Sequence, residues 1–174
     1  MALYQKVIQT KAGDMLAIAN ETHLLMLHFI NKPTIKDELQ IVKQQPNTEI
    51  LLTSNDILDN LELELNNYFN GKLNSFSTPI KFNFGTPFQQ KVWRALCEIP
   101  YGETISYKQL AENIGQPTAF RAVANANGRN FLTILVPCHR VIAADGSIGG
   151  YSSGIERKEM LLEIENNKNN TQCI

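Results

Sequence analysis

Cysteine is scarce in this 174-residue chain, and its three cysteines, Cys97, Cys138 and Cys173, match no disulfide or metal pattern. Their number is odd, no Cys-x-x-Cys pair occurs, and no group of cysteines and histidines has the spacing of zinc ligands. The sequence therefore predicts neither a disulfide-stapled domain nor a metal site. Free thiols are typical of a reducing compartment, so we predict a cytoplasmic protein.

Long apolar runs are missing as well. The longest, such as residues 24–30, are too short to cross a bilayer, and no basic segment with a long apolar stretch opens the chain. We therefore expect a soluble protein without a membrane partner. The length suits one domain, or two small ones, with a real hydrophobic core.

Arginine is absent from residues 1–86, where seven lysines and nine acidic residues give a net charge of −2. Residues 87–142 carry six basic and three acidic side chains, a net charge of +3. The net charge of the whole chain is −1, which argues against a nonspecific polyanion binder. The second half could nevertheless present a local anion-facing surface.

The first half has the pattern of a small α/β domain. Short β-branched runs between residues 3 and 30 predict an antiparallel meander, and a short helix is expected near residues 35–43. A second helix is expected between Ser54 as its N-cap and Gly71 as its C′ residue, with an apolar stripe that packs on the meander. Residues 72–85 resemble a connecting segment with one short strand.

Capped helices dominate the second half. Thr86 to Gln89 combine an N-cap, a proline at N1 and a glutamine at N3, which predicts a helix that buries Phe88, Val92, Trp93 and Leu96. Residues 106–109 resemble a second capping box. The helix that follows ends at Gly115, and a third helix runs from Ala119 to Gly128. This is the spacing of a helix-turn-helix, which is a weak signal by itself.

The third helix surrounds one long cation, Arg121, with alanines at positions 119, 122, 124 and 126. Such a surface would let a groove wall approach the backbone while Arg121 protrudes. An alanine-rich core helix with a solvated arginine explains the pattern equally well.

Cys138 lies at an enforced break in the chain. We predict strands at residues 131–136 and 140–144, because Pro137 cannot donate to a sheet and ends the first of them. His139 and Arg140 would favour the thiolate form of Cys138. A lone cysteine is more often an inert buried residue, and a Cys138–His139 contact would need a turn, a bridging water or a third group.

A loop with four glycines, residues 146–154, then exposes backbone amides near the thiol, after a hairpin turn predicted at residues 145–146. A last helix is expected from Ile155 to about Asn166, with Met160, Leu161, Leu162 and Ile164 toward the core. Cys173 falls in the polar tail and is assigned no role. His23 and His28 are interpreted as structural.

Taken together, the second half resembles the O6-alkylguanine-DNA alkyltransferase family, also called methylated-DNA–protein-cysteine methyltransferases. The matching segments are Thr86 to Trp93, Pro100 to Tyr107, Arg121 to Val123, Asn130, Pro137 to Val141 and Gly150 to Ser152. The resemblance implies an α+β fold. A small α/β, ribonuclease H-like domain (residues 1–85) would precede a mostly helical, winged-helix-like domain with a helix-turn-helix (residues 86–174).

The resemblance also implies a function, namely DNA repair by stoichiometric transfer of the alkyl group from O6-alkylguanine to Cys138 after the damaged nucleotide is flipped out. O4-alkylthymine is a further candidate substrate. His139 would relay the thiol proton through water, Glu165 would orient that imidazole, Tyr107 would protonate the leaving purine, and Asn130 would brace the preceding turn. No cofactor is implied.

Further roles in the family would be carried by residues around this centre. Arg121 would fill the vacated stack, and Tyr107, Lys108 and Gln116 would contact the DNA. Val141, Tyr151 and Ser152 would hold the flipped base. The protein would bind double-stranded DNA through the minor groove as a monomer, with cooperative binding left open.

Two departures from the family stand out. Some relatives have zinc in the first domain, but residues 1–96 contain no cysteine, so no metal is carried over. Residues 124–127, Ala-Asn-Ala-Asn, replace glycines and a bulkier apolar residue. Two rival functions stay open at this point: a Cys/His hydrolase, which would turn over repeatedly, and a noncatalytic binder of alkylated DNA, which would need no thiol.

Overall fold

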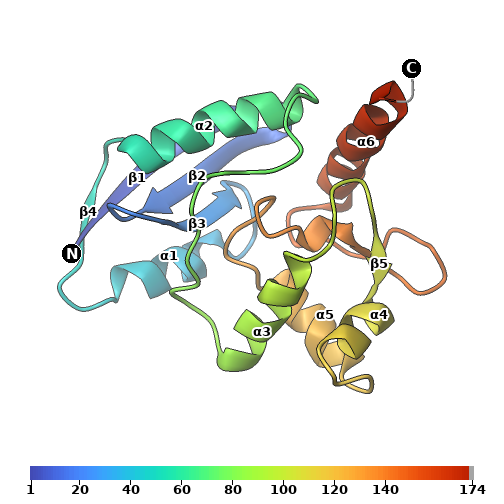
Figure 1. Ribbon diagram of the computed structural model, residues 1–174. Helices are drawn as coiled ribbons and strands as arrows, with labels where there is room; N and C mark the ends of the chain where they lie inside the picture. Colours follow the sequence, from blue (N-terminus) through green and yellow to red (C-terminus); the bar gives the residue numbers. More distant parts are fainter. Residues whose placement is uncertain (173–174) are drawn as a thin grey trace. The chain divides into compact units, whose positions relative to one another are not determined.

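The computed structural model describes residues 1–172 of the chain. They form two compact units, the first from Met1 to Phe84 and the second from Gly85 onward (Figure 1). Each unit has its own core. Cys173 lies outside the described residues. Among those described, no helix is long and apolar enough to span a membrane.

The first unit contains a four-stranded sheet of order β3-β2-β1-β4. The predicted meander is confirmed: β1 (Ala2–Thr10), β2 (Gly13–Ala19) and β3 (Leu24–Phe29) pair antiparallel in sequence. The short β4 (Glu49–Leu51), which we did not predict, pairs parallel with the start of β1. Every residue of β3 is buried, so both faces of the sheet are covered there.

Helices cover the two faces of this sheet (Figure 1). The helix α1 (Ile35–Lys43) lies where the sequence predicted it. On the other face α2 (Asp56–Phe69) buries its predicted apolar stripe and ends before Gly71, which has a left-handed φ of 71°. The N-cap prediction was off by one residue: the Asn55 side chain accepts the Leu58 amide, whereas the Ser54 hydroxyl donates to Asp59.

The connecting segment after α2 is held by a buried carboxylate rather than by a strand. The strand predicted within residues 72–85 is reduced to one isolated bridge between Leu24 and Ile80. Glu64 instead accepts the backbone amides of Ser77 at 2.7 Å and Thr78 at 2.8 Å. Buried backbone donors need such partners, so Glu64 fixes where the chain leaves the first unit.

The second unit begins with α3 (Pro87–Leu96), whose capping box is confirmed in both directions between Thr86 and Gln89. Trp93 anchors this helix: it is 1% exposed, and its indole nitrogen donates to the Ala126 carbonyl at 2.8 Å. Gly85 must be glycine, because a Cβ there would lie 2.4 Å from the Trp93 ring. Phe88 is half-buried rather than buried as predicted.

A parallel pair of two-residue strands, β5 (Ile105–Ser106) and β6 (Val141–Ile142), joins distant parts of the second unit. The helix α4 (Tyr107–Asn113) starts directly after β5, so its first residue lies beside the segment that follows Cys138. Ser106 caps α4, but Gln109 donates to Asn113 instead of closing a second capping box.

Two further helices complete the second unit. The helix α5 (Phe120–Gly128) packs against α3 and α4, and α6 (Ile155–Gln172) extends beyond the predicted end near residue 166. Its buried face was predicted only in part. Leu161 is buried as predicted, whereas Met160, Leu162 and Ile164 are half-buried. Lys158 and Glu165 are also buried on α6.

Candidate active site

The segment before Cys138 is a turn, not the predicted strand. Residues 131–136 form only an isolated bridge between Thr133 and Val136, and Ile134 has a φ of 77°. A β-branched residue rarely adopts this left-handed conformation. Asn130, 3% exposed, holds the turn by donating to the Val136 carbonyl and accepting the Leu132 amide, both at 2.9 Å.

Cys138 itself lies in a single 3-10 turn, Cys138–Arg140, that starts after Pro137. The Arg140 amide donates to the Pro137 carbonyl at 3.0 Å. The strand predicted at residues 140–144 shrinks to β6, and residues 143–147 close a tight turn rather than a hairpin. The turn removes the alternation of an extended strand, so Cys138 and His139 no longer face opposite ways.

The Cys138 side chain is 4% exposed and lines a pocket of about 350 Å³. One part of the pocket is lined by Tyr107 of α4 and by three residues of α5, namely Ala124, Asn127 and Gly128. Another part is lined by three residues of the glycine loop, namely Gly150, Tyr151 and Ser152. This volume falls in the range of about 300–1,000 Å³ found for small-molecule pockets. A thiol that looks inert by its burial is therefore reachable by a ligand of suitable size.

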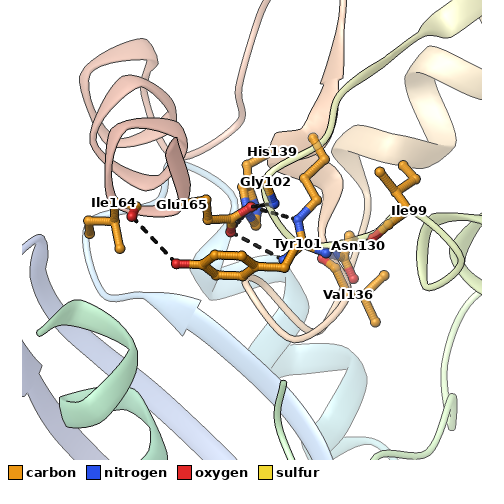
Figure 2. A network of polar contacts seen from close by, with 9 residues as sticks. Ile99, Tyr101, Gly102, Asn130, Val136, His139, Ile164 and Glu165 are labelled. Atoms are coloured by element: carbon orange, nitrogen blue, oxygen red, sulfur yellow. Dashed lines mark hydrogen bonds and ion pairs between the residues drawn. The ribbon is translucent and has the colours of Figure 1, made fainter. Parts of the chain in front are cut away.

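His139, the residue after Cys138, forms a buried pair with Glu165. The His139 Nε2 atom lies 2.6 Å from Glu165 Oε2, and the two residues are 0% and 1% exposed (Figure 2). Burial raises the pKa of Glu165, but hydrogen bonds from His139 and Arg140, together with the charge of Arg140, outweigh it and set the pKa at about 2. Burial lowers the pKa of His139. Near neutral pH the pair is therefore a carboxylate and a neutral imidazole.

This ionisation state fixes the imidazole tautomer. A carboxylate can only accept hydrogen bonds, so Nε2 of His139 must carry the proton that it donates to Glu165. The other nitrogen, Nδ1, then has a free lone pair. It is buried and has no hydrogen-bond partner among the described residues. His139 thus keeps its basic nitrogen unused.

Arg140 completes the network, although the sequence suggested only that it lies near the sulfur. Its Nε donates to Glu165 Oε1 at 2.7 Å and its Nη1 to the Ile99 carbonyl at 2.7 Å. The Tyr101 hydroxyl donates to the Ile164 carbonyl at 3.4 Å, and the Gly102 amide points at Glu165 (Figure 2). The residues 99–102 therefore hold the carboxylate in place.

Lys158 was missed by sequence reasoning, because an α6 position next to apolar residues gives no sign of a buried cation. It is 0% exposed, and its ammonium donates to the carbonyls of Val141 at 2.6 Å and Gly150 at 3.1 Å. The ammonium also lies 5.9 Å from the centre of the Tyr107 ring. Burial lowers the pKa of Lys158 to about 8, although the charge of Cys138 acts in the opposite direction and raises it.

The two tyrosines of the pocket keep their protons. Burial, followed by the charge of Cys138, raises the pKa of Tyr107. Tyr151 is half-buried with its hydroxyl enclosed, and burial together with the adjacent Cys138 raises its pKa well above 10. Both can therefore act as hydrogen-bond donors.

The remaining predicted residues lie in different surroundings. Val141 is buried and contributes its carbonyl, while Lys108, Gln116 and Arg121 are exposed and do not line the pocket. Within residues 1–172, no group of three or more His, Cys, Asp or Glu side chains could hold a metal ion.

These features define a two-domain α+β protein that places a cysteine, backed by an imidazole and a carboxylate, at a pocket in its helical second domain. Residues 3–82 match the family model of the "6-O-methylguanine DNA methyltransferase, ribonuclease-like domain", and residues 87–167 that of its "DNA binding domain". The family expected from the sequence is confirmed, as is the α+β fold with a sheet domain followed by a mostly helical domain.

The chain belongs to the methylated-DNA–protein-cysteine methyltransferase family. It is 41% identical to the family member of Methanosarcina barkeri over 165 residues, which cover 95% of this chain and 98% of the relative. An inducible member from Bacillus subtilis is 38% identical, with 94% and 90% covered. The crystal structure of Mycobacterium tuberculosis OGT in complex with DNA matches with a TM-score of 0.81 and 36% identity, covering 95% of this chain and 94% of that one.

Proposed function

We propose that this protein repairs DNA by moving the alkyl group of O6-alkylguanine to Cys138 in a single turnover. The observation that carries the proposal is that Cys138 lines a base-sized pocket, while the next residue in the chain, His139, forms a buried pair with Glu165. A duplex hides the guanine O6 atom, so the damaged nucleotide must leave the stack to reach such a pocket.

His139 is the base that activates the thiol. Its Nδ1 lone pair, fixed by the Glu165 carboxylate, accepts the Cys138 proton through one bridging water. Because the pKa of His139 is lowered by burial, the imidazole is neutral and ready to accept at pH 7. The nearby Lys158 cation favours the thiolate that results.

The transfer step is a displacement at carbon. The Cys138 sulfur forms a bond to the alkyl carbon while the bond from that carbon to O6 breaks, and its electron pair passes to the purine. Tyr107, whose pKa is raised, stays protonated until this step and donates its proton to the leaving purine. The proton that His139 took from Cys138 then returns through water to the Tyr107 phenolate, so the thiol proton ends on guanine. The products are guanine and a thioether. No group in the pocket offers a way to cleave a thioether, so each molecule reacts once and needs no cofactor.

Main-chain groups read the flipped base. The Cys138 carbonyl accepts a hydrogen bond from Asn127 and the Val141 carbonyl accepts one from Lys158, so both oxygens are held in fixed positions. These two carbonyls are the acceptors for the amino group of the base. The Ser152 amide faces the base from the glycine loop, and Tyr151 closes over it. O4-alkylthymine presents a similar alkyl group and is a second candidate substrate.

DNA engagement falls to α4 and α5, acting as a helix-turn-helix in the minor groove. Arg121 protrudes from α5 and fills the stack that the extruded nucleotide leaves, while Tyr107 helps to rotate that nucleotide. Lys108 and Gln116 are exposed and contact the backbone. The protein acts as a monomer on double-stranded DNA, in the reducing cytoplasm that a free thiol requires.

The proposal is tested with a duplex that carries radiolabelled O6-methylguanine. We expect at most one methyl group per protein molecule, and Cys138→Ala should bind the methylated duplex without accepting the label. Release of many labelled groups by a trace of protein would favour the hydrolase. Binding without any transfer by the wild type would favour a noncatalytic binder.

A further inference from the structure

A large apolar side chain stands exposed at the start of α5. Phe120 is the first residue of this helix and is 49% exposed, directly before Arg121. The alanine pattern of this helix gave no indication of the exposed phenylalanine, which lies between Ala119 and Ala122. Its neighbours Gln116, Pro117 and Thr118 are also exposed and uncharged.

Helix geometry relates Phe120 to the thiol pocket. An α-helix turns by roughly 100° per residue, so Phe120 lies roughly 40° to one side of Ala124 and Arg121 roughly 60° to the other. Ala124, together with Asn127 and Gly128, lines the pocket of Cys138. Phe120 and Arg121 therefore flank the same helix stripe about 6 Å before it enters the pocket.

The position of Phe120 at the start of α5 determines which part of the DNA can cover its ring. A base that enters the pocket must pass the stripe, so the DNA next to the extruded nucleotide lies against the start of α5. Proteins that open base steps from the minor groove commonly insert apolar wedges such as phenylalanine. Arg121 alone supplies charge but little apolar surface to cover an unstacked neighbouring base.

We infer that Phe120 is a second DNA-opening residue, an apolar wedge that packs against the base step adjacent to the vacated position while Arg121 occupies that position. The inference rests on the proposed function, because it concerns the extrusion of the damaged nucleotide. It assigns to Phe120 a role in duplex substrates only. A free base needs no extrusion and should not depend on the wedge.

The test compares Phe120→Ala and Phe120→Leu with the wild type on two substrates, an O6-methylguanine duplex and free O6-benzylguanine. Leu63→Ala is the matched control, since Leu63 is a 61% exposed apolar residue on α2. Aromatic–base stacking is worth about 1–3 kcal/mol, so Phe120→Ala should slow transfer from the duplex on the order of tenfold. Transfer from the free base should stay at the wild-type rate.

Phe120→Leu keeps apolar bulk and should lose less than Phe120→Ala, and Leu63→Ala should lose nothing. The fluorescence of a 2-aminopurine placed beside the lesion should rise less with Phe120→Ala, because the step opens less. A wild-type duplex rate for both Phe120 variants overturns the wedge, as does an equal loss on the duplex and the free base. If the wild type reacts with neither substrate, it is the repair function itself that fails.

Discussion

Replacing Glu165 by glutamine changes one atom but should reverse the direction of the hydrogen bond behind the thiol. Arg140 can only donate, so it will retain the amide oxygen of the new side chain. The amide NH2 group then faces Nε2 of His139, which must accept. The imidazole proton moves to Nδ1, and the nitrogen that should receive the thiol proton is no longer available.

The structure sets the size of both effects. The pKa of Glu165 is lowered from 4.5 to about 2, which corresponds to about 3 kcal/mol of stabilisation of the carboxylate. Removing one partner of a buried ion pair costs about 3–5 kcal/mol, so we expect Glu165→Gln to lower the free energy of unfolding by about 3 kcal/mol. Loss of general-base catalysis should slow methyl transfer roughly 10²- to 10⁴-fold.

Two assays separate the effects. Urea unfolding measures stability. The single-turnover rate on an O6-methylguanine duplex measures catalysis, and it is determined without urea at a temperature where both proteins are folded. Glu163→Gln is the matched control, because Glu163 is exposed on the same helix. If Glu165→Gln is destabilised but transfers methyl at the wild-type rate, His139 is not the base.

Further predictions concern other residues. Tyr107→Phe should slow transfer at least tenfold without weakening duplex binding, as a gel-shift titration would measure. Arg121→Ala should slow repair of the duplex more than reaction with free O6-benzylguanine; equal losses would remove its role in the stack. Lys158→Met should slow both substrates alike, because it releases two carbonyls at the pocket, and the thiol pKa measured by iodoacetamide alkylation should rise. Because the folded pKa of Glu165, about 2, is below 4.5, its contribution to stability is complete above about pH 4.5 and is lost as the pH falls toward 2, which acid titration followed by circular dichroism would detect. Transfer should also slow as the pH falls through the pKa of His139, which burial places below the ordinary histidine value of about 6.5.

Local sequence patterns predicted the structure correctly where the interactions that stabilise a segment lie within that segment. The reciprocal bonds of Thr86 and Gln89 follow from a four-residue motif, and the meander follows from alternating apolar runs broken by turn residues. The helix that ends before Gly71 was predicted for the same reason. In such segments the capping groups and the residues they satisfy are neighbours in sequence.

Long-range contacts decided the parts that were predicted wrongly. Residues 131–136 are mostly apolar and include three β-branched residues, yet Asn130 holds them in a turn, with Ile134 in a left-handed conformation. On α6 the apolar pattern predicted the buried face, but carbonyls and a guanidinium from distant segments bury Lys158 and Glu165 instead. The resemblance identified Glu165, whereas no local signal pointed to Lys158.

The most direct test of the account is to locate the transferred methyl group. Trypsin places the three cysteines on separate peptides, since cleavage after Arg129 and Arg140 isolates Cys138 within residues 130–140. After incubation with an O6-methylguanine duplex, we predict that mass spectrometry will find one methyl group on this peptide and none on those of Cys97 and Cys173. An unmodified Cys138 peptide, with the duplex either untouched or demethylated, would contradict the central claim that this thiol is the acceptor.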